Sequence, residues 1–188
     1  MVDHMLYHEK QRFYFCGIHA LNNLLGGPFL TKEILDEIAN RLSISTSSGW
    51  WNNPYKSMFG LGNYDVNVLM LALKEKGYDT QYLDTRREKN LWETQLKQQE
   101  TTAIGLVCNV RGIWNRHWKA IKFIKGDSLK VSTAPTTSFY NLDSKLSAPM
   151  KFGSRDELFQ HMTGLIETDP NTTILLVSPF ILDSKPKM

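Results

Sequence analysis

The sequence predicts an α+β fold in which helices come first along the chain and a mostly antiparallel sheet follows. Up to residue 77, apolar residues recur at helical spacing. Beyond that point the chain is dominated by short runs rich in β-branched and aromatic residues, which is typical of strands. This separation of helices from strands indicates an α+β protein with its N-terminal helices packed on the sheet.

The first half of the chain is predicted to contain three helices. The first covers residues 17–25 and stops at a Gly-Gly-Pro sequence, and the second follows Thr31, which is expected to be its N-cap. The third covers about residues 65–76 and ends before Gly77. All three helices present an apolar stripe, so they are expected to pack on a common core.

The strand-like segments of the second half are expected to form one sheet with two inserted helices. A capping box of Ser154 and Glu157 indicates where one of these helices begins. The predicted strands cover residues 80–84, 102–110, 117–124, 138–143 and 172–178.

Length and composition suit a single globular domain. The chain has 188 residues, of which 41% are hydrophobic and 22% charged, and it shows no repeat or low-complexity tract. We therefore expect one domain over residues 1–188, with a core over about residues 6–180 and a short C-terminal tail.

The charge and cysteine content narrow the function classes. The net charge is only +3 and the basic residues are dispersed, which argues against nucleic acid as a partner. No apolar run is long enough for a transmembrane segment, and two cysteines make no disulfide framework. We expect a soluble monomer in a reducing compartment, the cytoplasm, with the nucleus as a second location.

Cys16 is a candidate nucleophile because of its place at the start of the first helix. There it shares a helix side with His19 and Asn23, away from the leucines. Unpaired N–H groups and the helix dipole at such a position lower a thiol pKa. The competing interpretation is a small apolar filler, which is the interpretation we favour for Cys108 inside the run IGLVCNV.

A nucleophilic thiol needs a base, and His117 is the best candidate among five histidines. His4 and His8 are close to a terminus that we expect to be mobile. His161 falls inside a predicted helix, and His19 is expected to be held against the backbone. His117 begins a predicted strand, where its ring can reach another element.

Two residues are candidates for the group that orients the His117 ring. A symmetric hairpin of residues 117–124 and 138–143, centred on Lys130, sets Asp143 opposite His117. Asn141 lies two residues earlier on the same face and is the neutral alternative. In the competing interpretation Asp143 only begins a turn and His117 is an ordinary edge residue.

Four stretches, in order along nearly the whole chain, resemble the conserved blocks of one family. They are YHEKQRFYFCGIHALNNLL, GNYDVNVLMLALKEKG, RHWKAI and YNLDSKLSAP. They are similar to the Josephin family of cysteine-protease deubiquitinases, and most like its small free-standing members. The resemblance implies a papain-like fold and an isopeptidase or peptidase that acts at the C-terminus of ubiquitin, with ubiquitin or polyubiquitin as partner. It implies no metal and no organic cofactor.

The resemblance also implies residue roles. Cys16 would be the nucleophile, His117 the general base and Asp143 the orienting acid, with Asn141 as the alternative third member. Gln11 would be the side-chain donor of the oxyanion hole. The connection between the two hairpin strands, residues 125–137, looks longer than is usual in the family.

Ubiquitin contacts are expected around the exit of the first helix, the start of the third helix and the neighbour of the base. The candidates are Phe29, Leu30, Val66, Asn67 and Trp118. Core packing for Val66 and capping or turn duty for Asn67 are equally good interpretations.

Two other functions fit parts of the pattern. One is another acyl-transfer enzyme that uses Cys, His and Asp on a papain-like fold. The other is a ubiquitin-binding scaffold with little activity, against which the complete set of Gln11, Cys16, His117 and Asp143 speaks.

Overall fold

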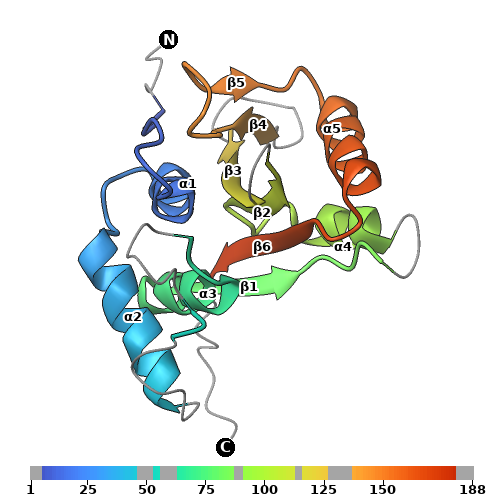
Figure 1. Cartoon of the computed structure of the whole chain (residues 1–188). Helices are drawn as coiled ribbons and strands as arrows, with labels where there is room; N and C mark the ends of the chain where they lie inside the picture. The colour runs from blue at the N-terminus through green and yellow to red at the C-terminus, as the bar shows by residue number, and fades with distance from the viewer. Residues whose placement is uncertain are drawn as a thin grey trace, which may run out of the picture.

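A computed structural model of the chain describes residues 6–45, 53–55, 63–86, 91–112, 116–126 and 137–180. One sheet stands between two groups of helices, with α1, α2 and α3 on one side and α4 and α5 on the other (Figure 1). The α+β prediction, with N-terminal helices packed on a mostly antiparallel sheet, is confirmed.

The three helices predicted in the first half are all found, with bounds within three residues of the predicted ones. The second inserted helix, which the sequence did not locate, is α4, and a two-residue strand, β5, was not predicted. The helices are α1 (Cys16–Leu25), α2 (Lys32–Ser45), α3 (Val66–Glu75), α4 (Leu91–Gln99) and α5 (Arg155–Thr168). The strands are β1 (Tyr78–Tyr82), β2 (Gly105–Arg111), β3 (Arg116–Lys125), β4 (Thr137–Asn141), β5 (Met150–Lys151) and β6 (Thr173–Pro179).

The sheet has the strand order β1-β6-β2-β3-β4-β5, and all the strand pairs within the described residues are antiparallel. β6 is the last of these strands along the chain, yet it lies between β1 and β2. The sheet therefore joins early and late parts of the sequence.

The two faces of the sheet build two separate hydrophobic cores. Side chains alternate along each strand, so Val107 and Leu175 join the core under α1, α2 and α3. Leu106 and Leu176, each one residue away, join the second core with α4 and α5. Cys108 belongs to this second core and is fully buried, as the sequence predicted.

Helix α1 is buried on both of its sides, because chain segments cover its polar side as well. Leu21 and Leu24 point into the first core. On the other side the Asn23 amide donates to the Leu142 carbonyl at 3.0 Å, and its side-chain oxygen accepts from the Glu9 N–H at 2.6 Å. These bonds hold the last turn of α1 between the N-terminal segment and the segment after β4.

The hairpin of β3 and β4 has a different register from the symmetric one predicted. Ile121 pairs with Asn141, and the Leu142 N–H continues this register by donating to the Ala120 carbonyl at 2.8 Å. The predicted register was therefore wrong by two residues. A shift of two residues leaves each side chain on the same face of the sheet. Asp143 therefore lies diagonally across from His117 and not directly opposite it. Most of the connection, residues 127–136, lies outside the described residues.

Candidate active site

Three elements bring Cys16, His117 and Asp143 together. Cys16 is the first residue of α1, His117 the second of β3, and Asp143 follows β4 by two residues. The His117 Nε2 atom lies 2.7 Å from Asp143 Oδ1, and His117 is close enough to Cys16 to lower the pKa of its thiol. Because Asp143 occupies Nε2, the ring nitrogen left for the sulfur is Nδ1.

The surroundings of Cys16 favour its ionised form. Burial raises the pKa of its thiol, but the hydrogen bond and charge of His117 and the backbone N–H groups of Trp118 and Gly17 lower it further than burial raises it. The net pKa is below the ordinary value for cysteine. A thiolate at this position is the form that attacks a carbonyl carbon.

The pKa values of His117 and Asp143 are shifted in opposite directions, as expected for an ion pair. Burial lowers the pKa of His117, but the bonds to Asp143 and Cys16 raise it above its ordinary value. Burial raises the pKa of the Asp143 carboxyl, but His117 and the backbone N–H of Lys145 bring it below its ordinary range. Near neutral pH Asp143 is therefore ionised, so a protonated His117 ring would be paired with a carboxylate.

Asp143 is held in place by bonds to its backbone and its carboxylate. Its N–H donates to Asn141 Oδ1 at 3.1 Å, and its carbonyl lies 3.0 Å from His8 Nε2. The Lys145 N–H donates to Asp143 Oδ1 at 2.9 Å. Asn141, the alternative third member, therefore binds the backbone of Asp143, whereas the His117 ring is bonded to the Asp143 carboxylate. His8, expected near a mobile terminus, is half-buried in this cluster.

Gln11 is fixed beside the site by its own neighbours. Its Nε2 group donates to the Phe13 carbonyl at 2.8 Å, and its backbone N–H donates to the Ser144 carbonyl at 2.8 Å. A primary amide has two N–H groups, so one of them is left for another acceptor. Phe13 has a φ of 50°, an unusual conformation for a residue other than glycine, which orients its carbonyl.

His19 has a structural position, as the sequence predicted. Its Nδ1 lies 2.5 Å from Glu9 Oε2 and its Nε2 accepts from the backbone N–H of Arg12 at 3.2 Å. Both ring nitrogens are engaged, and the ring ties the N-terminal segment to α1.

A cleft of about 400 Å³ leads to the residues on either side of His117. Residues 63–66, at the start of α3, form one wall, and Arg116 and Trp118 contribute to the other. Trp118 is 3% exposed and its indole N–H donates to the Tyr64 carbonyl at 3.2 Å, which joins the two walls. Val66, a predicted ubiquitin contact, also lines this cleft.

The other predicted ubiquitin contacts lie in varied surroundings. Phe29 is 51% exposed. Leu30 is 2% exposed and its N–H donates to Asn22 Oδ1, so it is a core residue and presents no surface. Asn67 is exposed, with its backbone and side-chain N–H groups both bonded to Asp65 Oδ1 in the cap of α3.

A buried polar pair under the site was not predicted from the sequence. Lys119, on β3, is 5% exposed and its Nζ lies 3.1 Å from His161 Nε2 on α5. Burial and the neighbouring Lys119 charge lower the pKa of His161 to about 4, so His161 is neutral near pH 7. A lysine at an inward position of an alternating strand was the signal that could have revealed this pair.

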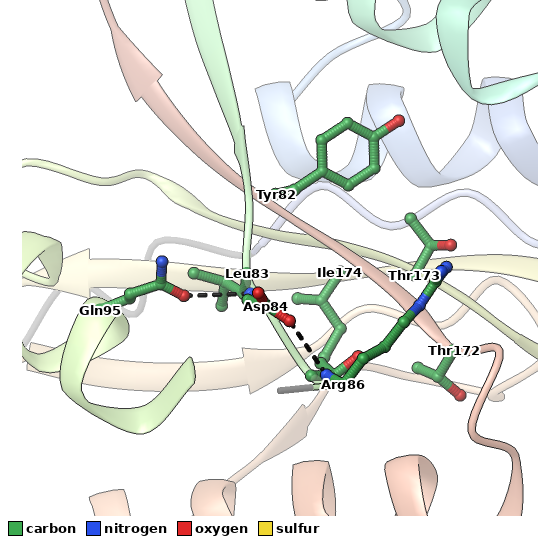
Figure 2. Close-up of a pocket in the computed structure, with 9 residues that line it drawn as sticks. Tyr82, Leu83, Asp84, Arg86, Gln95, Thr172, Thr173 and Ile174 are labelled. Atoms are coloured by element: carbon green, nitrogen blue, oxygen red, sulfur yellow. Dashed lines mark hydrogen bonds between the residues drawn. The ribbon is translucent and has the colours of Figure 1, made fainter. Parts of the chain in front are cut away.

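A further pocket, of about 480 Å³, lies where β1 ends and β6 begins (Figure 2). Asp84 contributes two bonds inside it, because its N–H donates to Gln95 Oε1 and its carboxylate accepts from the Arg86 N–H. Cys16, His117 and Asp143 do not line this pocket. It shares Thr173 with the cleft beside His117, so the two hollows adjoin.

Two kinds of site are absent from the ranges that the structure describes. Within those ranges no helix combines the length and apolarity that crossing a membrane requires. Likewise, His, Cys, Asp and Glu side chains form no group of three or more there that could hold a metal ion.

Comparison with known proteins gives a consistent result. The Josephin family model matches residues 11–178. The chain is 31% identical over 188 residues to a Josephin-like protein of Drosophila melanogaster, and the alignment covers 94% of this chain and 76% of that protein. It is 36% identical over 161 residues to human Josephin-2, covering 80% of this chain and 74% of Josephin-2. A match over most of the sequence that also contains the Cys, His and Asp cluster leads to one conclusion: the chain belongs to the Josephin family.

Proposed function

We propose that this protein is a deubiquitinating cysteine protease that hydrolyses peptide or isopeptide bonds at the C-terminus of ubiquitin. The observation that supports this most strongly is the contact of 2.7 Å between His117 and Asp143, next to a thiol of lowered pKa at a helix start. Membership of the Josephin family supports ubiquitin as the substrate. Neither feature is needed for a scaffold that only binds ubiquitin.

In the proposed reaction Cys16 and His117 begin as a thiolate and an imidazolium. The thiolate attacks the carbonyl carbon, and the carbonyl oxygen becomes an oxyanion that the free N–H of Gln11 can bind. His117 then gives its proton to the departing amine as the C–N bond breaks. Asp143 holds the ring and stabilises its positive charge.

The second half of the reaction regenerates the enzyme. The thioester between Cys16 and the acyl group is attacked by water, from which His117 removes a proton. Collapse of this second intermediate breaks the C–S bond and releases the carboxylic acid, leaving thiolate and imidazolium again. The steps consume one water and need no cofactor.

The acyl part of the substrate is proposed to lie in the cleft beside His117. The two walls of this cleft, joined by the buried Trp118 ring, leave room for a thin, extended chain. The tail of ubiquitin ends in two glycines, the least bulky of residues. We propose that the enzyme acts as a monomer in the cytoplasm, where both of its buried cysteines would stay reduced.

Labelling with ubiquitin that carries a thiol-reactive C-terminus tests this function. We expect rapid formation of one adduct at Cys16, found by mass spectrometry, which disappears in Cys16→Ala and persists in Cys108→Ala. A different acyl-transfer enzyme would react no faster with this probe than with a small thiol reagent. A scaffold would bind ubiquitin without forming the adduct, and either result would contradict the proposal.

A further inference from the structure

A second hollow borders the site at the N-terminal segment and the segment after β4. It has a volume of about 530 Å³, and Lys10, Gln11 and Phe13 line one side of it, with Ser144 and Lys145 on the other. The bond from the Gln11 N–H to the Ser144 carbonyl joins the two sides. This hollow, here called the lysine pocket, is separate from the cleft beside His117, since the two share no lining residue.

The lysine pocket contains polar atoms that the described residues leave unsatisfied. Ser144 is 3% exposed, and its hydroxyl has no hydrogen-bond partner. The Gln11 Oε1 atom is buried and also lacks a partner. Most buried polar atoms in proteins are hydrogen-bonded. Among the described residues, these two are the buried side-chain atoms without a partner, and both belong to residues that line this pocket.

The lysine pocket lies on the side of the site where the leaving group is expected. The cleft contains the chain neighbours of His117, whereas the lysine pocket contains Gln11 and the residue that follows Asp143. The reacting carbonyl must lie between them, over Cys16. If the thin acyl chain occupies the walled cleft, the amine and the chain that carries it leave across the lysine pocket.

The charge of the lysine pocket is of one sign. Lys10 and Lys145 are exposed, and no carboxylate is among its lining residues. The role of Lys145 toward Asp143 uses only its backbone N–H, so its side chain is available to a substrate. A positive rim attracts acidic groups and raises the rate of their association, particularly at low salt.

We propose that the lysine pocket is the leaving-group subsite, and that Lys10 and Lys145 make the enzyme prefer ubiquitinated lysines flanked by acidic residues. This inference rests on the proposed function. It concerns only the target side of the scissile bond, and it adds a selection that the catalytic residues themselves do not provide.

Two matched conjugates test the inference. Ubiquitin is linked by an isopeptide bond to the lysine of a short peptide, with two glutamates beside that lysine in one conjugate and two lysines in the other. The measured quantity is the ratio of their kcat/KM values, so a general effect on catalysis cancels. Ubiquitin with a C-terminal aminocoumarin, whose leaving group has no peptide, is assayed in parallel.

For the wild-type chain we expect the acidic conjugate to be cleaved about fivefold faster, the scale of two exposed charge pairs. The ratio should fall toward one as salt is raised, and it should invert in the double variant Lys10→Glu, Lys145→Glu. Lys74→Glu, the same charge change in the last turn of α3, is the control and should keep the wild-type ratio.

A wild-type ratio of one, or an unchanged ratio in the double variant, would overturn the inference. If wild-type chain failed to release aminocoumarin, or if release survived Cys16→Ala, the proposed function itself would be wrong. The failures of the two proposals are therefore distinguishable.

Discussion

The two cysteines lie in different regions of the same fold, and the two regions treat a buried thiol in opposite ways. Cys16 at the start of α1 is 4% exposed, and Cys108 in the middle of β2 is 0% exposed. Burial raises the pKa of Cys108 to about 12, and the nearby Lys119 charge offsets this only in part. The pKa of Cys16 is lowered despite similar burial.

The difference shows that burial alone does not determine the chemistry of a thiol. Cys16 receives hydrogen bonds from a side chain and from two backbone N–H groups, whereas Cys108 faces its strand partner Lys119 across a ladder whose backbone groups are already paired. The reactivity of a buried thiol therefore depends on the donors around its sulfur.

The largest effect is expected when the Cys16 thiol is removed, and removal of the Cys108 thiol is its control. Cys16→Ala should lower turnover of a ubiquitin conjugate by more than about 10⁴-fold, because the nucleophile is lost. Cys108→Ala should keep turnover within a few fold. Rates of aminocoumarin release measure both, with circular dichroism as the check of folding. If Cys108→Ala abolished turnover and Cys16→Ala did not, the nucleophile would be Cys108 and not Cys16.

A second difference is the proposed oxyanion donor, Gln11, which precedes Cys16 by five residues. Gln11→Ala should lower kcat by about 10²- to 10³-fold, the usual cost of one such donor. Ubiquitin affinity, measured on the Cys16→Ala background by calorimetry, should change little. An unchanged kcat would show that the Gln11 amide only supports the Phe13 carbonyl.

The third member of the triad can be tested against its neighbour. Asp143→Ala should cost about 10²-fold in probe labelling rate, less than the loss of the acid costs a serine enzyme, since a thiolate needs less help from its base. Asn141→Ala should cost less, because it removes only the support of the Asp143 backbone. Asp143→Asn should retain measurable labelling. A larger loss in Asn141→Ala would make Asn141 the true orienting group.

The pH dependence of alkylation compares the two thiols directly. Because the pKa of Cys16 is lowered, its reaction with iodoacetamide should already be fast below about pH 8.5, the usual thiol pKa. His117→Ala removes the main opposing influence to burial, so the midpoint should move upward. Cys108 should react only on unfolding. Peptide mapping by mass spectrometry at each pH separates the two sites, and equal midpoints would contradict the comparison.

The smallest effect is on stability, and here the order reverses. Cys108→Ala leaves a small void in the second core and should lower the free energy of unfolding by about 1 kcal/mol. Cys16→Ala should cost less, because its sulfur lies at the edge of a core beside polar groups. Urea denaturation of the two variants gives both values, and a greater loss for Cys16→Ala would show that its sulfur mainly fills space.

Much of this arrangement follows from local sequence patterns. Asp65 and Ser154 mark helix starts by accepting backbone N–H bonds, and Gly77 has the positive φ that ends the third helix. These signals act over a few residues, so the sequence alone predicts them. The alternation of Leu106, Val107 and Cys108 between two cores is equally local.

Features that depend on distant residues were not predictable in the same way. The hairpin register depends on the connection between β3 and β4, whose centre could not be placed from a symmetric count. The role of Asn141 depends on where the chain turns after β4. Leu30 was a candidate ubiquitin contact, but it is buried and its N–H is bonded to Asn22. Helix α4 is mostly polar, so its apolar stripe is weak.

The central place of β6 has a consequence for how the protein acquires its activity. Before residues 173–179 leave the ribosome, β1 lacks its partner and β2 lacks one of its two partners. Contacts between such distant parts of a chain make folding slow, because long loops must close first. Cys16 is synthesised early, and His117, the proposed base, follows it by about 100 residues. A nascent chain is therefore expected to remain catalytically silent until synthesis has passed β6, which protects it from reacting while it is still incomplete.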